Sequence, residues 1–149
     1  MWKLGIRERL AAIYPGTRTL GLCLWVVTDG LVEAIGVGTA PKDVGSAWLE
    51  RFSPDVILVE SHRQSSRKPS PVRIPANTSL RFVRSGWEGR KLRIPAGVTD
   101  RSPLAANAWR MGVQEVIDRG PYKASSLDVR DLTQEWIDAH SPPRIANGY

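Results

Sequence analysis

The net positive charge of this 149-residue chain lies in the stretch from Ser61 to Arg101. It holds ten Lys or Arg residues and two acidic ones, whereas the rest of the chain holds eleven basic and thirteen acidic residues. Charge gathered in one region favours a local surface for a polyanion such as nucleic acid over a general effect on solubility. The alternative is a solvated basic loop without a partner. With Arg18 from outside the stretch, the residues expected to contact nucleic acid are Arg63, Arg67, Lys68, Arg81, Arg84, Arg90 and Lys91.

Two aromatic residues of the basic stretch add a second kind of contact. Trp87 lies between Gly86 and Glu88, with arginines close by in sequence, and Phe82 lies between Arg81 and Val83. Aromatic rings among cationic side chains stack on exposed bases of single-stranded nucleic acid. The open alternative is that these rings pack back onto the domain.

Asp128 and Asp131 are two carboxylates three residues apart, a spacing that in a helix would put both side chains on one face. The plainer reading is a pair of surface carboxylates that balance Arg130.

Alternating apolar runs and turn residues predict the elements that must position these groups. Residues 11–14 form a strand stopped by Pro15 and Gly16, and residues 20–28 and 31–39 form two more strands around the hairpin signal Asp29-Gly30. Short turns between three strands predict an antiparallel meander.

The remaining elements are predicted from helical periodicity and apolar runs. Residues 43–52 form a helix with Asp43 as its N-cap, and the wholly apolar run 56–59 reads as a buried parallel strand. Beyond it we predict a long basic insertion at 61–99 with a hairpin near 79–94, a helix at 100–119, a strand at 122–132, a helix at 132–139 and a tail at 140–149. The length and apolar content fit one domain spanning residues 1–149.

Two motifs stand at the ends of predicted strands. They are Ile13-Tyr14-Pro15-Gly16-Thr17-Arg18 with Gly21 following, and Pro54-Asp55-Val56-Ile57-Leu58-Val59-Glu60. With the meander and the helix between them, these motifs resemble the RuvC-type Holliday junction resolvases of the RNase H-like superfamily. Residues 104–112 are similar to the helix that follows the glutamate strand in that family, and residues 122–133 to its next strand. The resemblance implies an α/β, RNase H-like fold with three antiparallel strands, then parallel strands, in one mixed sheet with flanking helices.

The same resemblance implies a carboxylate centre for phosphodiester cleavage. In such nucleases several carboxylates hold two divalent cations, Mg²⁺ or Mn²⁺, that activate water and stabilise the leaving oxygen. Glu60 takes one family position, and Asp128 and Asp131 are the candidates for the others, with Glu60 and Asp131 as metal ligands. Tyr14 stands where the family has its first aspartate, and a neutral phenol is a poor ligand for these cations. His62 is a candidate for assisting phosphate or metal binding, or an ordinary loop residue.

Three functions are open at this point. The first is a RuvC-like protein that binds branched or single-stranded DNA, or RNA, with impaired catalysis. The second is an active metal-dependent endonuclease that resolves junctions, as in phages, and the third is an assembly protein built on the same scaffold. The resemblance raises a homodimer as a further expectation.

The cysteine content and the hydropathy pattern indicate the compartment. Cys23, the only cysteine, lies in an apolar run, which predicts a buried thiol and a reducing, cytoplasmic setting. No apolar run is long enough to span a membrane, and the N-terminus lacks the apolar core of a signal peptide, so we expect no membrane partner.

Overall fold

A six-stranded mixed sheet forms the centre of the protein. The computed structural model describes residues 7–28, 30–60, 72–83, 94–119 and 127–142. Its elements along the chain are β1 (Arg7–Pro15), β2 (Thr19–Thr28), β3 (Leu31–Pro41), α1 (Lys42–Phe52), β4 (Val56–Glu60), β5 (Ser79–Val83), α2 (Pro103–Arg119), β6 (Val129–Asp131) and α3 (Gln134–His140).

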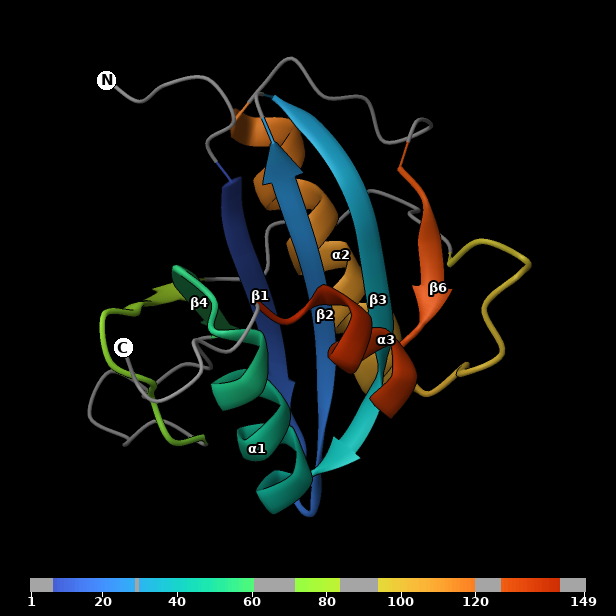
Figure 1. Ribbon diagram of the computed structural model, residues 1–149. Helices are drawn as coiled ribbons and strands as arrows, with labels where there is room; N and C mark the ends of the chain where they lie inside the picture. Colours follow the sequence, from blue (N-terminus) through green and yellow to red (C-terminus); the bar gives the residue numbers. More distant parts are fainter. Residues whose placement is uncertain (1–6, 29, 61–71, 84–93, 120–126, 143–149) are drawn as a thin grey trace.

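The sheet order is β5-β4-β1-β2-β3-β6. The first three strands pair antiparallel, β4 and β5 run parallel to β1, and β6 runs parallel to β3. Strands β1, β3, β4, β5 and β6 therefore all end at one side of the sheet, which we call the carboxyl edge. In Figure 1 the arrowheads of β1, β3 and β6 point toward this edge.

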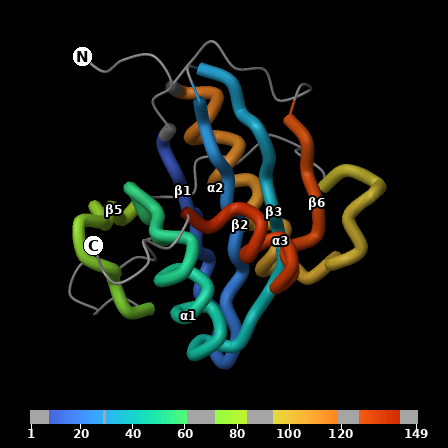
Figure 2. Tube along the Cα trace, viewed as in Figure 1, coloured from blue at the N-terminus to red at the C-terminus, as the bar shows by residue number. Residues whose placement is uncertain are grey.

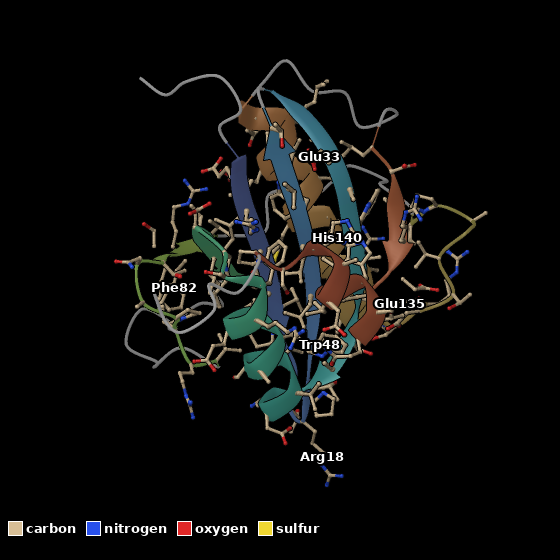
Figure 3. All side chains as sticks on the ribbon, viewed as in Figure 1. Arg18, Glu33, Trp48, Phe82, Glu135 and His140 are labelled. Carbon is tan, nitrogen blue, oxygen red and sulfur yellow. The ribbon has the colours of Figure 1, made fainter. Side chains whose placement is uncertain are left out.

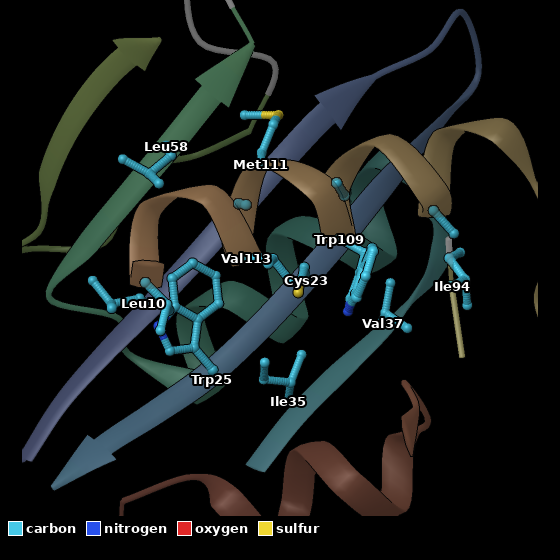
Figure 4. Close-up of a cluster of buried hydrophobic side chains, with 14 of the residues drawn as sticks. Leu10, Cys23, Trp25, Ile35, Val37, Leu58, Ile94, Trp109, Met111 and Val113 are labelled. Carbon is cyan, nitrogen blue, oxygen red and sulfur yellow. The ribbon is translucent and has the colours of Figure 1, made fainter. Parts of the chain in front are cut away.

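Helices cover both faces of the sheet. Helices α1 and α3 lie on one face and α2 crosses the other, as the ribbon and the tube show (Figures 1 and 2). The side chains of β1 alternate accordingly, because Leu10 and Ala12 belong to the core under α2 whereas Ala11 and Ile13 belong to the core under α1 and α3. Trp25 and Trp109 are buried in the α2 core (Figure 4).

Gly21 sets the close approach of α2 to the sheet. A Cβ atom at this position would lie 1.9 Å from the carbonyl oxygen of Leu104, in the first turn of α2. Any side chain here would therefore push the helix away from β2, and the start of α2 is held beside the carboxyl edge.

The meander, the helix after it and the buried parallel strand are confirmed. Gly30, in the predicted hairpin turn, has φ of 84°, which glycine adopts without strain. The predicted N-cap was wrong, because Pro41 precedes the first residue of α1 and Asp43 lies within its first turn. Helix α2 begins at Pro103, three residues later than predicted.

Two segments differ from the predictions. Residues 79–83, expected in a hairpin of a long insertion, form edge strand β5 paired parallel to β4, and residues 84–93 lie outside the described part. The last strand is only Val129–Asp131, and it pairs with β3 at the far end of the sheet. The segment that resembled the strand following the glutamate therefore does not adjoin β4.

Cys23 is a buried thiol in β2. Burial raises its pKa above the ordinary value, so the thiol stays protonated. The prediction of a buried thiol is confirmed.

Candidate functional site

Tyr14 and Glu60 are neighbours at the carboxyl edge. The parallel register pairs Ile13 of β1 with Val59 of β4, so the next residues of the two strands, Tyr14 and Glu60, come side by side. Tyr14 packs against the core under α2, to which Leu58 also belongs. Because alternate residues share a face, Glu60 faces α2 as Tyr14 does.

Glu60 is the one charged side chain that the described part of the chain buries. Its relative exposure is 5%, at the last position of β4 and beside Val83 of β5. Burying a carboxylate is costly unless it is hydrogen-bonded or balanced by charge, so a side chain of this kind marks a candidate functional position.

Asp128 and Asp131 do not join Glu60. Strand β6, which ends at Asp131, is four inter-strand steps away from β4 in the sheet order, and at the usual strand spacing this separates them by about 19 Å. Oxygen ligands of one Mg²⁺ ion each lie about 2.0–2.1 Å from it. Glu60 and Asp131 are therefore not brought together as ligands of a shared cation.

Asp128 and Asp131 also share no helical face, because a strand forms within the segment 122–132, where a strand is predicted. Val129–Asp131 is a strand, and Asp128 immediately precedes it. Residues three apart in extended chain point to opposite faces, so the two carboxylates diverge. An i,i+3 spacing alone could not distinguish a helix from a strand.

Asp131 instead binds the chain that leads into α2. It accepts hydrogen bonds from the Thr99 hydroxyl at 2.6 Å, the Thr99 amide at 3.0 Å and the Asp100 amide at 3.3 Å. The Thr99 hydroxyl is the main cause that holds the pKa of Asp131 below its ordinary value, helped by the two amides and Arg101 and opposed by burial. Asp131 is thus an ionised acceptor with structural partners.

The described residues do not fit the two-cation centre that the resemblance implies. No group of three or more His, Cys, Asp and Glu side chains among them is arranged to hold a metal ion. Beside Glu60 stands the phenol of Tyr14, a poor ligand for Mg²⁺ or Mn²⁺. His62, the other candidate near Glu60 in sequence, lies outside the described residues.

Of the predicted phosphate contacts, Arg18 and Arg81 can be placed. Arg18 is exposed in the turn between β1 and β2 and projects from the carboxyl edge, whereas Glu33 lies toward the opposite end (Figure 3). Arg81 of β5 forms an ion pair with Glu115 of α2. The other predicted contacts lie outside the described residues: Arg63, Arg67, Lys68, Arg84, Trp87, Arg90 and Lys91.

Sequence reasoning missed two features of this edge. Lys42, the first residue of α1, is exposed immediately after the end of β3. Thr99 hydrogen-bonds to Asp131 of β6, and Asp100 to Thr39 of β3. The polar run Thr99-Asp100-Arg101-Ser102 just before a helix is the sequence feature that could have indicated these contacts.

Phe82 is the only aromatic among the large exposed apolar side chains of the described chain. It is 36% exposed on edge strand β5, at the left of Figure 3. Its register partner in β4 is Val59, the residue before Glu60. An aromatic ring is therefore accessible close to the carboxyl edge, as base stacking requires.

A separate hollow lies between α1 and α3. It has a volume of about 790 Å³, and its lining includes Trp48, Arg51, Gln134 and Asp138. The Trp48 indole donates to Gln134 at 2.9 Å, and Arg51 lies 2.9 Å from Asp138. These contacts tie the two helices together on the face opposite to Glu60 and Tyr14.

Comparisons with known proteins identify no family for this chain. No protein-family model matches the chain, and no curated protein matches it. Among the described residues, no helix has the length and apolar character needed to cross a membrane.

Proposed function

We propose that this protein binds nucleic acid at the carboxyl edge of its sheet, on an RNase H-like, RuvC-type scaffold that does not cleave its partner. The observation that carries the proposal is the pairing of Tyr14 with Glu60. The strand order around them, with an antiparallel meander and a parallel strand ending in a buried glutamate, suits the scaffold. The neighbouring position holds the phenol of Tyr14, a poor ligand for the cations that such cleavage needs.

The placement of charge supports binding at this edge. Residues 61–71, which contain three basic and no acidic residues, follow Glu60, and residues 84–93, with four basic residues and one acidic, follow Val83. Both stretches therefore leave the described structure at the carboxyl edge, where Arg18 and Lys42 are exposed. Basic side chains supply the sequence-independent attraction for phosphates, and at this edge Arg18 and Lys42 are exposed.

The partner we favour is branched or single-stranded DNA in a reducing, cytoplasmic setting. Exposed Phe82 supports unpaired bases as part of the target, because aromatic rings stack on any base. Buried, protonated Cys23 suits a reducing compartment.

A paired binding and cleavage assay tests this proposal. Labelled four-way junction, duplex and single strand are incubated with the protein in Mn²⁺ and in chelator. We expect binding in both conditions that weakens steeply with salt, and intact DNA throughout. Nicking in Mn²⁺ that Glu60→Gln abolishes would establish an active nuclease, and no binding at low salt would overturn the proposal.

A further inference from the structure

Arg18 and Lys42 come together at the carboxyl edge, although they are far apart in sequence. The antiparallel register pairs Thr19 of β2 with Pro41 of β3. Arg18 directly precedes Thr19 and Lys42 directly follows Pro41, so each is one peptide unit, about 3.8 Å, beyond a paired Cα atom. The two residues therefore lie side by side where β2 begins and β3 ends.

The backbone at both positions is held in place. The amide of Gly16 donates to the Thr19 carbonyl at 2.9 Å, which closes the turn that carries Arg18. Lys42 is the first residue of α1 and follows Pro41, whose ring restricts its φ angle, here −58°. A ligand between the two side chains therefore meets a backbone that is already ordered.

Two cations in this arrangement are unfavourable without a ligand. Both residues are exposed, and neither forms an ion pair with another residue of the described ranges. Like charges opposite each other on neighbouring strands destabilise a sheet. Lys42 also stands at the amino end of α1, where the helix dipole disfavours a cation. An anion bound between Arg18 and Lys42 offsets both effects.

Asp43 is the acidic residue next to this pair in sequence. It follows Lys42 in α1, where successive side chains point about 100° apart. Asp43 lines a hollow of α1 to which Ser46, Glu50 and Arg73 also contribute. The positive charge of the pair is therefore available to an anion from outside the chain.

The charge of the pair selects the kind of phosphate. An internal phosphodiester carries one negative charge, whereas a phosphate monoester at a strand end carries about 1.5 to 2 at pH 7. Two adjacent cations match the charge of the monoester better. We propose that Arg18 and Lys42 form one binding site for a phosphate monoester, the phosphorylated end of a bound strand. This inference rests on the proposed function and adds which part of the strand the carboxyl edge recognises.

Binding of three single-stranded oligodeoxynucleotides to the full chain tests this site. They share one sequence and an internal fluorescein, and they carry hydroxyl ends, a 5′-phosphate or a 3′-phosphate, with chelator present throughout. We expect a phosphate at the 5′ or the 3′ end to lower Kd about fivefold in 0.1 M salt, the equivalent of about one further phosphate contact. The hydroxyl-ended strand still binds through internal phosphates, so the ratio of the two Kd values is the quantity to compare between variants.

Both cations should be necessary for this ratio. In Arg18→Gln and in Lys42→Gln we expect it to fall from about five to below about two, whereas Arg18→Lys, which keeps the charge, should retain most of it. Arg130→Gln is the matched control. Arg130 is exposed and pairs with Gly36 of β3, about 20 Å from Lys42 along the strand at about 3.3 Å per residue. This control should keep the wild-type ratio whatever its effect on overall affinity.

A measurement on the wild type alone covers the case of a variant that does not fold. Amide chemical shifts are compared between the complexes with the hydroxyl-ended and the phosphorylated strand. The two sets of shifts should differ most in the turn 16–18 and at Lys42, and they should agree at Arg130. Differences that leave this turn and Lys42 unaffected would contradict the site.

The outcomes separate this inference from the proposed function. Equal affinity of the wild type for all three strands, or a preference that either Arg18→Gln or Lys42→Gln keeps, overturns the monoester site and leaves binding at the carboxyl edge standing. Failure of the wild type to bind any of the strands overturns both.

Discussion

Tyr14 lies beside Glu60 on adjacent parallel strands, and both side chains face α2. This relationship decides how the carboxyl edge is interpreted, because the position next to the buried glutamate holds a neutral phenol. A substitution of Tyr14 therefore tests this interpretation directly.

Tyr14→Asp should convert the neutral neighbour into a second carboxylate. Two adjacent carboxylates, one of them buried, repel each other, so we expect a loss of about 1–3 kcal/mol in the free energy of unfolding at pH 7. Thermal unfolding with and without Mn²⁺ checks the account: the cation should raise the melting temperature of Tyr14→Asp and leave wild type and the control Tyr14→Asn unchanged. An equal rise for the wild type would mean that its edge already binds the cation.

Gly21→Ala should be among the most destabilising small substitutions. The new Cβ would meet the Leu104 carbonyl, so α2 must move, at a cost of about 2–4 kcal/mol in the free energy of unfolding. Gly97→Ala is the matched control, since no atom lies within 4 Å of its added Cβ and it should change stability by less than about 0.5 kcal/mol. Urea denaturation measures both, and equal midpoints for the two variants would contradict the close contact.

The hydrogen bonds of Asp131 predict a dependence of stability on pH. Its pKa is lower in the folded protein than in the unfolded chain, so its contribution is present above the ordinary carboxylate pKa of about 4 and is lost as pH falls through the lowered folded pKa. At pH 6 we expect wild type to exceed Asp131→Asn by about 1 kcal/mol, a modest value because the carboxylate is partly solvated. Urea denaturation from pH 6 to pH 2 should show this difference shrinking, and a constant difference would refute the assignment.

Arg18 and Arg81 should contribute unequally to nucleic-acid binding. Arg18 is exposed in a turn, whereas Arg81 pairs with Glu115. Arg18→Gln should therefore weaken binding by about fivefold in 0.1 M salt and lower the salt slope by about one, while Arg81→Gln changes affinity by less than about twofold. Fluorescence anisotropy titrations measure both, and a larger loss for Arg81→Gln would show that its ion pair opens on binding.

The sequence predicts the central strands of the sheet well and edge strand β5 poorly. Residues 11–14, 20–28, 31–39 and 56–59 have apolar runs bounded by turn residues, because the central residues of these strands are buried. Strand β5 has no such run, since Arg81 and Phe82 are exposed at the end of the sheet. For the same reason the sequence predicts a hairpin of a long insertion here rather than a strand paired with β4.

The candidate site divides in the same way. Glu60 could be predicted because it directly follows the apolar run 56–59, which predicts a buried strand. The register of β1 with β4 then places Tyr14 beside it. The hydrogen bonds of Asp131 could not be predicted, because its partners Thr99 and Asp100 are some thirty residues away in sequence. Contacts between residues far apart in sequence produce no local spacing pattern from which they could be predicted.

Mapping amide chemical-shift changes during titration with single-stranded or junction DNA tests the central claim most directly. The account predicts that the largest changes fall at the carboxyl edge, in the turn around Arg18, at Lys42 and at Val83, and that the β2–β3 turn near Leu31 stays unchanged. Changes confined to the hollow between α1 and α3, or to the end of the sheet at Leu31, would contradict it.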